Sequence, residues 1–144
     1  MTFYVFDLDG TLADCSHRLH FINGETKDWR GFFAAVEGDQ PIDHVLDTLC
    51  HLERSRENRI EIWSGRSDEC RPQTESWLNR NGIQRSYLTH MRKAGDHRPD
   101  DVVKLEFLRD CDACPDIIFD DRDRVVQMWR REGLTCFQVA NGAF

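Results

Sequence analysis

The sequence lacks the features that would place the chain in a membrane, in a secretory pathway or on nucleic acid through bulk charge. No apolar run approaches the ~20 residues of a membrane span. The N-terminus has no basic region followed by a long apolar stretch, so we expect no signal peptide and a cytosolic protein. With 19 Lys and Arg against 26 Asp and Glu, the net charge is −7, whereas a general nucleic-acid coat is basic. Any phosphate must therefore be bound by local arginines or by a metal ion.

We also expect no disulfide framework. The chain has six cysteines, but without a secretory signal, and with enough residues to build a core, they are predicted to be free thiols. Cys111 and Cys114 have the spacing of a zinc or redox motif. Zinc would need two more ligands, and no second pair has ligand spacing. We therefore favour an ordinary position at a helix end for this pair.

Internal repeats, low-complexity tracts and Ser/Gly linkers are missing too, which predicts one domain over residues 1–144. Short apolar runs alternate with amphipathic stretches. The runs are Phe3–Phe6, Ile60–Trp63, Ile117–Phe119 and Thr135–Val139, with a weaker one near Tyr87–Leu88. Such alternation predicts an α/β fold: a three-layer, Rossmann-like parallel sheet with helices on both faces.

Four helices are expected between these strands, because apolar residues recur there at helical spacing. They cover Ile42 to Leu52 after Pro41, Pro72 to Asn81 closed by Gly82, a stretch opened by Pro99 that includes Val102 to Leu108, and Val125 to Trp129 ended by Gly133. The segment from Asp14 to Gln40 is longer than a usual connection. Because it carries Trp29, Phe32 and Phe33, we expect a small helical flap or cap, either beside the site or packed away from it.

Polar side chains follow three of the predicted strands. The first strand leads into Asp7-Leu8-Asp9-Gly10-Thr11, the second into Ser64-Gly65-Arg66-Ser67 and the fourth into Asp120-Asp121-Arg122. Ligands of open parallel sheets bind beyond the carboxyl ends of the strands. We therefore expect four aspartates and one serine to meet at one edge. Single aspartates after strands are often helix caps or turn formers, but the whole set is not explained that way.

Four carboxylates in one place repel one another, and a bound divalent cation relieves this repulsion. Oxygen ligands alone select a hard ion, and Mg²⁺ is the abundant one. A carboxylate in such a site can attack phosphorus to form an acyl phosphate, and a second acid can protonate the leaving oxygen and then activate water. Ser64, backbone N–H groups around Gly10 and a lysine would stabilise the phosphoryl oxygens. Lys104 is the lysine candidate, with an ordinary surface position as the alternative.

These motifs resemble those of the haloacid dehalogenase superfamily of Mg²⁺-dependent phosphotransferases. Asp7-x-Asp9-Gly10-Thr11 is similar to its first motif, Ser64 to its second, Lys104 to its third and Asp120-Asp121 to its fourth. A closer resemblance, over nearly the whole chain, is to the 3′-phosphatase domain of bacteriophage polynucleotide kinase/phosphatase. The stretches that carry it are DGTLADCSHR, WSGRS, MRKAGDHRPDDVVK and FDDRDRVVQMWRREGLTCFQVANGAF.

The resemblance implies roles for individual residues. Asp7 would be the nucleophile and Asp9 the general acid–base, with Mg²⁺ held by Asp7, the backbone carbonyl of Asp9 and the pair Asp120/Asp121. Which member of that pair touches the metal directly is left open. The predicted substrate-binding residues are Thr11, Arg18, Gly65, Arg66, Arg92, Arg98 and Asp100. Arg18 and Arg66 would engage the substrate, and Asp100 would orient Lys104 or an arginine.

The implied activity is Mg²⁺-dependent removal of a 3′-phosphate from a DNA or RNA end, as in nucleic-acid end repair, in the host cytoplasm if the chain is phage-encoded. No G-x-x-x-x-G-K-[ST] motif occurs, so kinase activity is not expected. The alternatives are a 5′(3′)-nucleotidase acting on free nucleotides and a non-catalytic binding module of the same fold. We expect a nucleic-acid end or nucleotide as partner, no membrane and no obligate protein partner.

Overall fold

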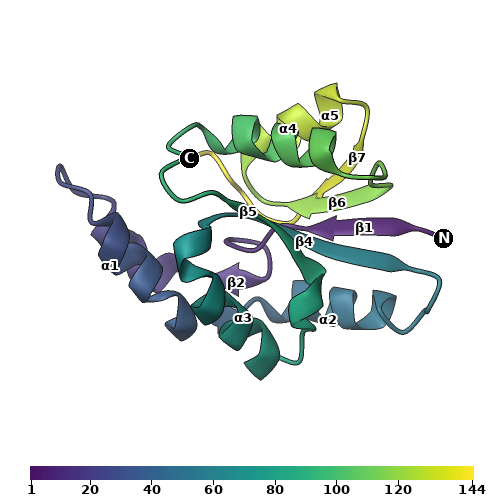
Figure 1. The fold of residues 1–144 in the computed structure, drawn as a ribbon, viewed down its shortest axis with the longest axis horizontal. Coiled ribbons are helices and arrows are strands. Elements are labelled where there is room, and N and C mark those ends of the chain that lie inside the picture. The colour runs from purple at the N-terminus through teal and green to yellow at the C-terminus, as the bar shows by residue number, and fades with distance from the viewer.

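The computed structural model describes all 144 residues and has a central sheet of five parallel strands in the order β5-β4-β1-β6-β7 (Figure 1). The strands are β1 (Phe3–Phe6), β4 (Arg59–Ser67), β5 (Leu88–Arg92), β6 (Ile117–Asp120) and β7 (Thr135–Gln138). β1 lies in the middle, paired with β4 on one side and β6 on the other. The predicted α/β class with a parallel sheet is therefore confirmed.

Helices cover both faces of this sheet, as predicted for strands that are apolar on both sides. They are α2 (Asp43–Leu52), α3 (Arg71–Arg80), α4 (Asp100–Asp110) and α5 (Asp123–Arg131). Figure 1 shows α4 and α5 above the sheet and α2 and α3 below it. Alternate residues of β1 enter different cores: Phe3 and Val5 join the α4/α5 side, and Phe6 joins the α2/α3 side. Three layers result.

The predicted elements differ from the observed ones mainly at their ends. Gly82 and Gly133 lie just beyond α3 and α5, and Pro99 directly precedes α4. β4 continues past the apolar run Ile60–Trp63 to Ser67, with a register shift against β5 between Ser64 and Ser67. Hydrogen bonding to a neighbouring strand extends β4 through a polar motif that side-chain periodicity alone does not mark as strand.

The segment between β1 and α2 folds out from the sheet edge and returns to it. Short strands β2 (Ala13–Asp14) and β3 (Gln40–Pro41) pair antiparallel at its base. Between them lie α1 (Trp29–Ala34) and two 3₁₀ turns, Ser16–Phe21 and Val36–Gly38. We call residues 14–40 the flap. In Figure 1 it lies at the side toward which β1 runs. None of the helices has both the length and the apolar character needed to cross a bilayer.

Two neighbouring valines of α4 test which face of this helix packs into the core on the α4/α5 side of the sheet. Val103 is 2% exposed and Val102 is 39% exposed. We expect Val103→Ala to lower the free energy of unfolding by about 2 kcal/mol, because buried methyl groups are lost and a cavity remains. Val102→Ala is the matched control, with a change within about 0.5 kcal/mol. The gain in helix propensity is the same for both, so equal losses in urea denaturation would contradict the assigned face.

Candidate active site

Three of the four predicted aspartates meet at the carboxyl edge of the sheet. Asp7 directly follows β1, Asp120 is the last residue of β6 and Asp121 comes next. Each offers a carboxylate oxygen, and these oxygens lie within 4.8 Å of one another. All three residues are buried. Such a group of oxygen ligands on adjacent parallel strands has the composition that suits Mg²⁺.

Lys104 is the only cation in direct contact with this carboxylate group. Its Nζ lies 2.7 Å from Asp7 Oδ1 and 2.9 Å from Asp120 Oδ2, and its side chain is 1% exposed. The alternative of a surface lysine is therefore wrong. Burial alone would lower its pKa, but the neighbouring carboxylates of Asp120 and Asp7 hold the pKa well above its ordinary value. Lys104 is thus charged at neutral pH.

One lysine does not neutralise three carboxylates, and the pKa values of Asp7 and Asp121 are both raised. Burial raises the pKa of Asp7 well above its usual value; Lys104 opposes this rise, while the nearby Asp120 adds to it. Burial and the charge of Asp120 raise the pKa of Asp121 to about 6. These carboxylates fit a divalent cation, because the charge of the cation would offset both the cost of their desolvation and their mutual repulsion.

The loop after β1 is shaped around the carboxylates. Gly10 has φ +83°, and a Cβ at this position would overlap the carboxylate of Asp121. Thr11 is fully buried, and its hydroxyl lies 3.3 Å from Asp7 Oδ2 and 3.4 Å from Asp121 Oδ1. Thr11 is therefore placed to orient carboxylates. Its predicted contact with substrate stays a prediction.

Asp9 is separated from the other three aspartates and faces two buried arginines. Its Oδ1 accepts hydrogen bonds from Arg18 Nη2 at 2.7 Å and from Arg66 Nη2 at 2.6 Å and Nε at 2.9 Å. Burial opposes ionisation of Asp9, but the guanidinium groups of Arg66 and Arg18 outweigh it and lower the pKa. The carboxylate form of Asp9 is therefore stabilised in the resting protein. A role for its backbone carbonyl toward a metal stays a prediction.

Asp39, at the end of the flap, completes this ion network and was not identified from the sequence. Its side chain is 0% exposed and accepts from Arg18 Nε at 2.8 Å and Arg66 Nη2 at 2.8 Å. His17 Nε2 lies 2.7 Å from the same carboxylate, and the Trp77 indole donates to the Asp39 backbone carbonyl at 2.7 Å. Once both arginines are known to be buried, two guanidinium groups need more than one carboxylate, but the sequence alone does not show that burial.

Arg18 and Arg66 direct most of their donors at these two aspartates. Arg66 also donates from Nη1 to Thr74 Oγ1 at 3.1 Å. Arg18 Nη1 is buried without a hydrogen-bond partner, and its guanidinium carbon lies 4.3 Å from the centre of the Phe32 ring. Both arginines hold the base of the flap against the sheet edge. Direct contact of either one with substrate remains a prediction.

Ser64 and Gly65 place the irregular end of β4 beside the site. Ser64 is 1% exposed, and its Oγ accepts from the backbone N–H of Arg66 at 3.1 Å. A Cβ on Gly65 would overlap the carboxylate of Asp100, so glycine makes room for this aspartate. Asp100 Oδ2 in turn lies 3.8 Å from Lys104 Nζ. Asp100 Oδ1 accepts a hydrogen bond from Arg92 Nη2 at 3.0 Å, so the lysine and an arginine are both near it, and its orienting role stays a prediction.

Arg92 and Arg98 have most of their donors engaged inside the protein. Arg92 donates to the carbonyls of Gly65 at 2.8 Å and Arg98 at 2.6 Å, and to Asp100 Oδ1 at 3.0 Å. Arg98 pairs with Asp96 and with Glu106 on the surface, both within 2.7 Å. Both arginines brace the loop from residue 93 to residue 99. Their predicted contact with substrate is not tested by this geometry and stays a prediction.

A cleft of about 1230 Å³ connects the site to the surface. Asp7, Asp9, Gly65 and Arg66 lie on its wall, and the flap contributes residues of α1 and of the segment before α1. The flap therefore borders the site and is not packed away from it. Cys111 and Cys114 are free thiols that belong to no cluster of metal-ligand type, and the other four cysteines are free as well.

The chain is similar to known proteins along its whole length. The family model for the phosphatase domain of polynucleotide kinase PNKP matches residues 1–144. The chain is 28% identical over 127 residues to a protein of Autographa californica nuclear polyhedrosis virus described as a bifunctional polynucleotide kinase/RNA ligase, covering 86% of this chain and 17% of the relative. The chain thus spans only a small part of this viral protein.

Solved structures agree on the fold. A chain in the Pnkp1/Rnl/Hen1 complex superposes with a TM-score of 0.79 at 32% identity, covering 99% of this chain and 46% of that one. A haloacid dehalogenase family enzyme from Bacteroides thetaiotaomicron, solved with magnesium and inorganic phosphate, has a TM-score of 0.56 at 12% identity, covering 96% of this chain and 93% of that one. This second likeness shows the fold alone. Because the family model spans all 144 residues, the chain belongs to the family of polynucleotide kinase phosphatase domains and is a phosphatase of the haloacid dehalogenase fold.

Proposed function

We propose that this phosphatase removes the 3′-phosphate from DNA or RNA ends, with Mg²⁺ and through a phosphorylated Asp7. The observation that carries the proposal is the position of Asp7. Its carboxylate is bonded to Lys104 at 2.7 Å, lies in the same oxygen cluster as Asp120 and Asp121, and lines an open cleft. The same cleft is lined by Asp9, the acid two residues on.

Asp7, Asp120 and Asp121 would hold Mg²⁺ among their carboxylate oxygens. The ion would neutralise negative charge on the phosphoryl group and on its ligands. Lys104 contributes a fixed positive charge at the nucleophile. It keeps Asp7 oriented and offsets the charge of the phosphoryl oxygens as they approach a buried carboxylate.

Asp7 forms the new bond to phosphorus while the ester bond to the 3′ oxygen breaks, and Asp9 gives its proton to that oxygen. Asp9 then removes a proton from water, whose oxygen attacks phosphorus, releases inorganic phosphate and restores Asp7. Arg66 and Arg18 favour the ionised form of Asp9 in the resting protein. The acid form is favoured when a dianionic phosphate enters, because a nearby negative charge raises the pKa of a carboxyl group.

The size of the cleft supports a polymer end as the substrate. Pockets for small molecules occupy roughly 300–1,000 Å³, and this cleft, of about 1230 Å³, is larger. The Pnkp1 chain of similar fold belongs to a complex with Rnl and Hen1. Two further expectations stay predictions: that the domain needs no obligate protein partner, and that it lacks kinase activity.

Replacement of the nucleophile tests the chemistry. We expect Asp7→Asn to lower kcat for phosphate release from a 3′-phosphorylated oligonucleotide at least about 10³-fold, because an amide cannot form the acyl phosphate. Asp43→Asn is the matched control on the exposed start of α2 and should leave kcat unchanged. Asp9→Asn should slow turnover by about 10²–10⁴-fold while Mg²⁺ still binds. Unchanged turnover in Asp7→Asn would contradict the assignment.

Binding of Mg²⁺ should strengthen with pH. Burial raises the pKa of Asp121 to about 6, whereas an unfolded aspartate has a pKa of about 4. The metal-free protein therefore gains stability from the protonated form at low pH and loses it as pH rises through about 6. Mg²⁺ competes with these protons and relieves the repulsion that appears at higher pH.

Thermal unfolding with and without Mg²⁺ measures this effect. At about pH 8 a hundredfold excess over Kd should stabilise by about 2.7 kcal/mol, and at about pH 5 by much less. Asp121→Asn should abolish the Mg²⁺ effect while making the metal-free protein more stable at about pH 8. An equal Mg²⁺ effect at both pH values would show that the carboxylates do not bind it.

A turnover series decides the substrate class. The same sequence is offered as a 3′-phosphorylated oligonucleotide, as a 5′-phosphorylated oligonucleotide and as 3′- and 5′-mononucleotides, with kcat/KM as the readout. The proposal expects the 3′-phosphorylated strand to be preferred by about tenfold or more, because binding outside the reacting group adds about 1.4 kcal/mol or more. Equal or faster turnover of free nucleotides would establish the nucleotidase alternative and keep the Asp7 chemistry.

A further inference from the structure

Trp29 is the one tryptophan whose indole is largely on the surface. Trp63, Trp77 and Trp129 are at most 1% exposed, whereas Trp29 is 45% exposed. It is the first residue of α1 in the flap, and its side chain lines the same cleft as Asp7 and Asp9. A large apolar ring exposed inside a functional cleft points to a ligand surface more strongly than a single exposed ring elsewhere.

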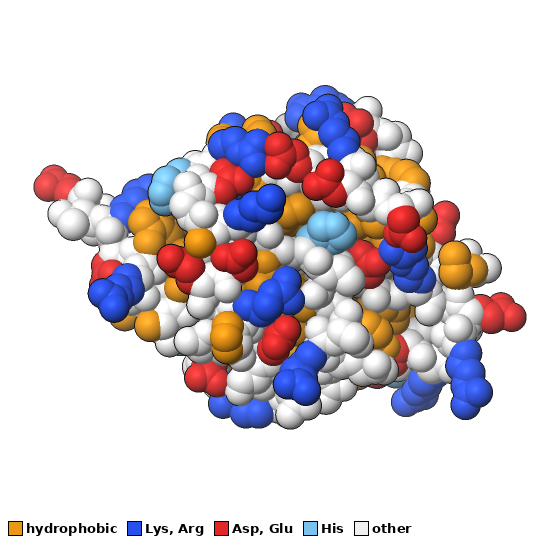
Figure 2. Space-filling view, viewed as in Figure 1, with side chains coloured by type: hydrophobic (Ala, Val, Ile, Leu, Met, Phe, Trp, Pro, Cys, Tyr) orange, Lys and Arg blue, Asp and Glu red, His pale blue; other side chains and the backbone are white.

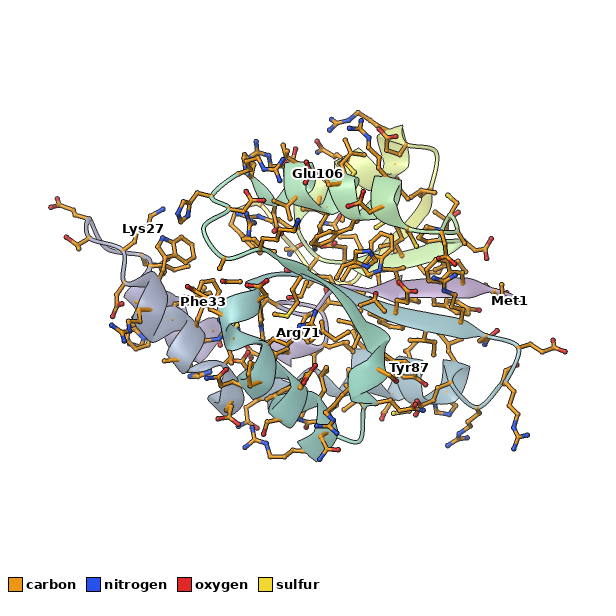
Figure 3. All side chains as sticks on the ribbon, viewed as in Figure 1. Met1, Lys27, Phe33, Arg71, Tyr87 and Glu106 are labelled. Carbon is orange, nitrogen blue, oxygen red and sulfur yellow. The ribbon has the colours of Figure 1, made fainter.

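The indole is supported by the other aromatic rings of the flap. The Phe33 ring lies 6.0 Å away with planes 27° apart, and the Phe32 ring meets the indole edge-on at 5.7 Å and 87°. Lys27 Nζ is 5.8 Å from the indole centre. Figure 3 shows Lys27 and Phe33 together at the flap end of the molecule. The ring is therefore positioned before any ligand arrives, which reduces the entropy cost of binding.

The cleft also has the charge that a nucleic-acid strand needs. The chain carries −7 overall, and Figure 2 shows acidic and basic side chains mixed over the face that it displays. Eight Lys and Arg residues line the cleft against six Asp and Glu, but five of the arginines are paired with carboxylates. Lys27 and Arg30, which flank Trp29 in the sequence, form no ion pair and leave free positive charge on the flap side of the cleft. Free cations beside an aromatic ring are the arrangement by which proteins hold single strands.

We propose that Trp29 is a stacking platform for an unpaired nucleobase at the 3′ end of the substrate, with Lys27 and Arg30 attracting the strand backbone. This inference rests on the proposed function and names the part of the substrate that the flap recognises. Stacking accepts any base, because every base has a π face. The platform therefore gives affinity for strand ends without base preference and makes Trp29 a specificity-determining residue of the flap.

The test compares substrates with and without a base, using the whole chain with Mg²⁺. They are a short 3′-phosphorylated single strand, the same strand with abasic residues at its 3′ end, and glycerol phosphate. Trp29→Ala should lower kcat/KM about 5- to 150-fold on the first substrate, mainly through KM, and change the other two by less than about twofold. Trp29→Phe should recover most of the loss. Phe137→Ala is the control, since Phe137 is 51% exposed on β7 and lies outside the cleft.

Each result has a distinct meaning. Equal loss on all three substrates would mean that Trp29 supports the packing of the flap, and no loss on any of them would mean that nothing stacks on it in turnover; either result overturns the platform. Wild-type protein that does not release phosphate from 3′ ends but hydrolyses mononucleotides overturns the proposed function. In that case the platform is still tested by the loss of kcat/KM in Trp29→Ala, compared between phosphates that carry a base and phosphates that do not.

A second measurement does not depend on turnover. In Asp7→Asn protein, titration with the 3′-phosphorylated strand should quench tryptophan fluorescence, because Trp29 is the exposed indole. The quench should disappear in the double variant with Trp29→Phe and should be weak with the abasic strand. A quench that survives Trp29→Phe would contradict the proposal. So would a quench produced equally by the base-bearing and abasic strands.

Discussion

The repulsion among Asp7, Asp120 and Asp121 is the constraint on which the site depends. Parallel strands β1 and β6 end at the same edge, so their following carboxylates are forced together, within 4.8 Å. Lys104 is brought to them by core packing, because Val103, Lys104 and Phe107 form the buried face of α4. An uncompensated buried charge costs about 3–5 kcal/mol. The ammonium of Lys104 offsets part of that cost. The negative charge that remains would attract a divalent cation, and the bound cation would in turn attract a phosphoryl group.

The second ion network differs from the first in its charge balance. Arg18 and Arg66 face Asp9 and Asp39, so two cations meet two anions, and Asp39 joins them from the far end of the flap. Moving the flap base would separate buried charges at a cost of several kcal/mol. These ion pairs therefore hold the base of the flap in place and keep Asp9 oriented. Trp29, at the start of α1, takes part in none of these ion pairs.

Local pattern was sufficient to predict the five strands of the central sheet, apart from their ends, and the four helices that cover it. It succeeded because apolar runs and strand-tip polar residues are neighbours in sequence, as in Asp7 after Phe3–Phe6. Asp39 was missed because its partners are remote: Arg66 lies 27 residues away, and nothing in EGDQP distinguishes a buried carboxylate from a turn residue. Periodicity also did not separate Val102 from Val103, since only the packed structure shows which valine faces the sheet.

The burial of Asp7 bears on why a terminal phosphate suits this site. Asp7 is only 6% exposed, and Lys104, beside it, is 1% exposed. An internal phosphodiester carries a sugar on two of its oxygens and would have to bring both into this recess. A terminal phosphate carries one sugar, so three oxygens are free to approach Lys104 and the carboxylates proposed to hold the metal, while the strand leaves through the cleft. Under the proposed function, the same burial that raises the pKa of Asp7 also restricts the reaction to strand ends.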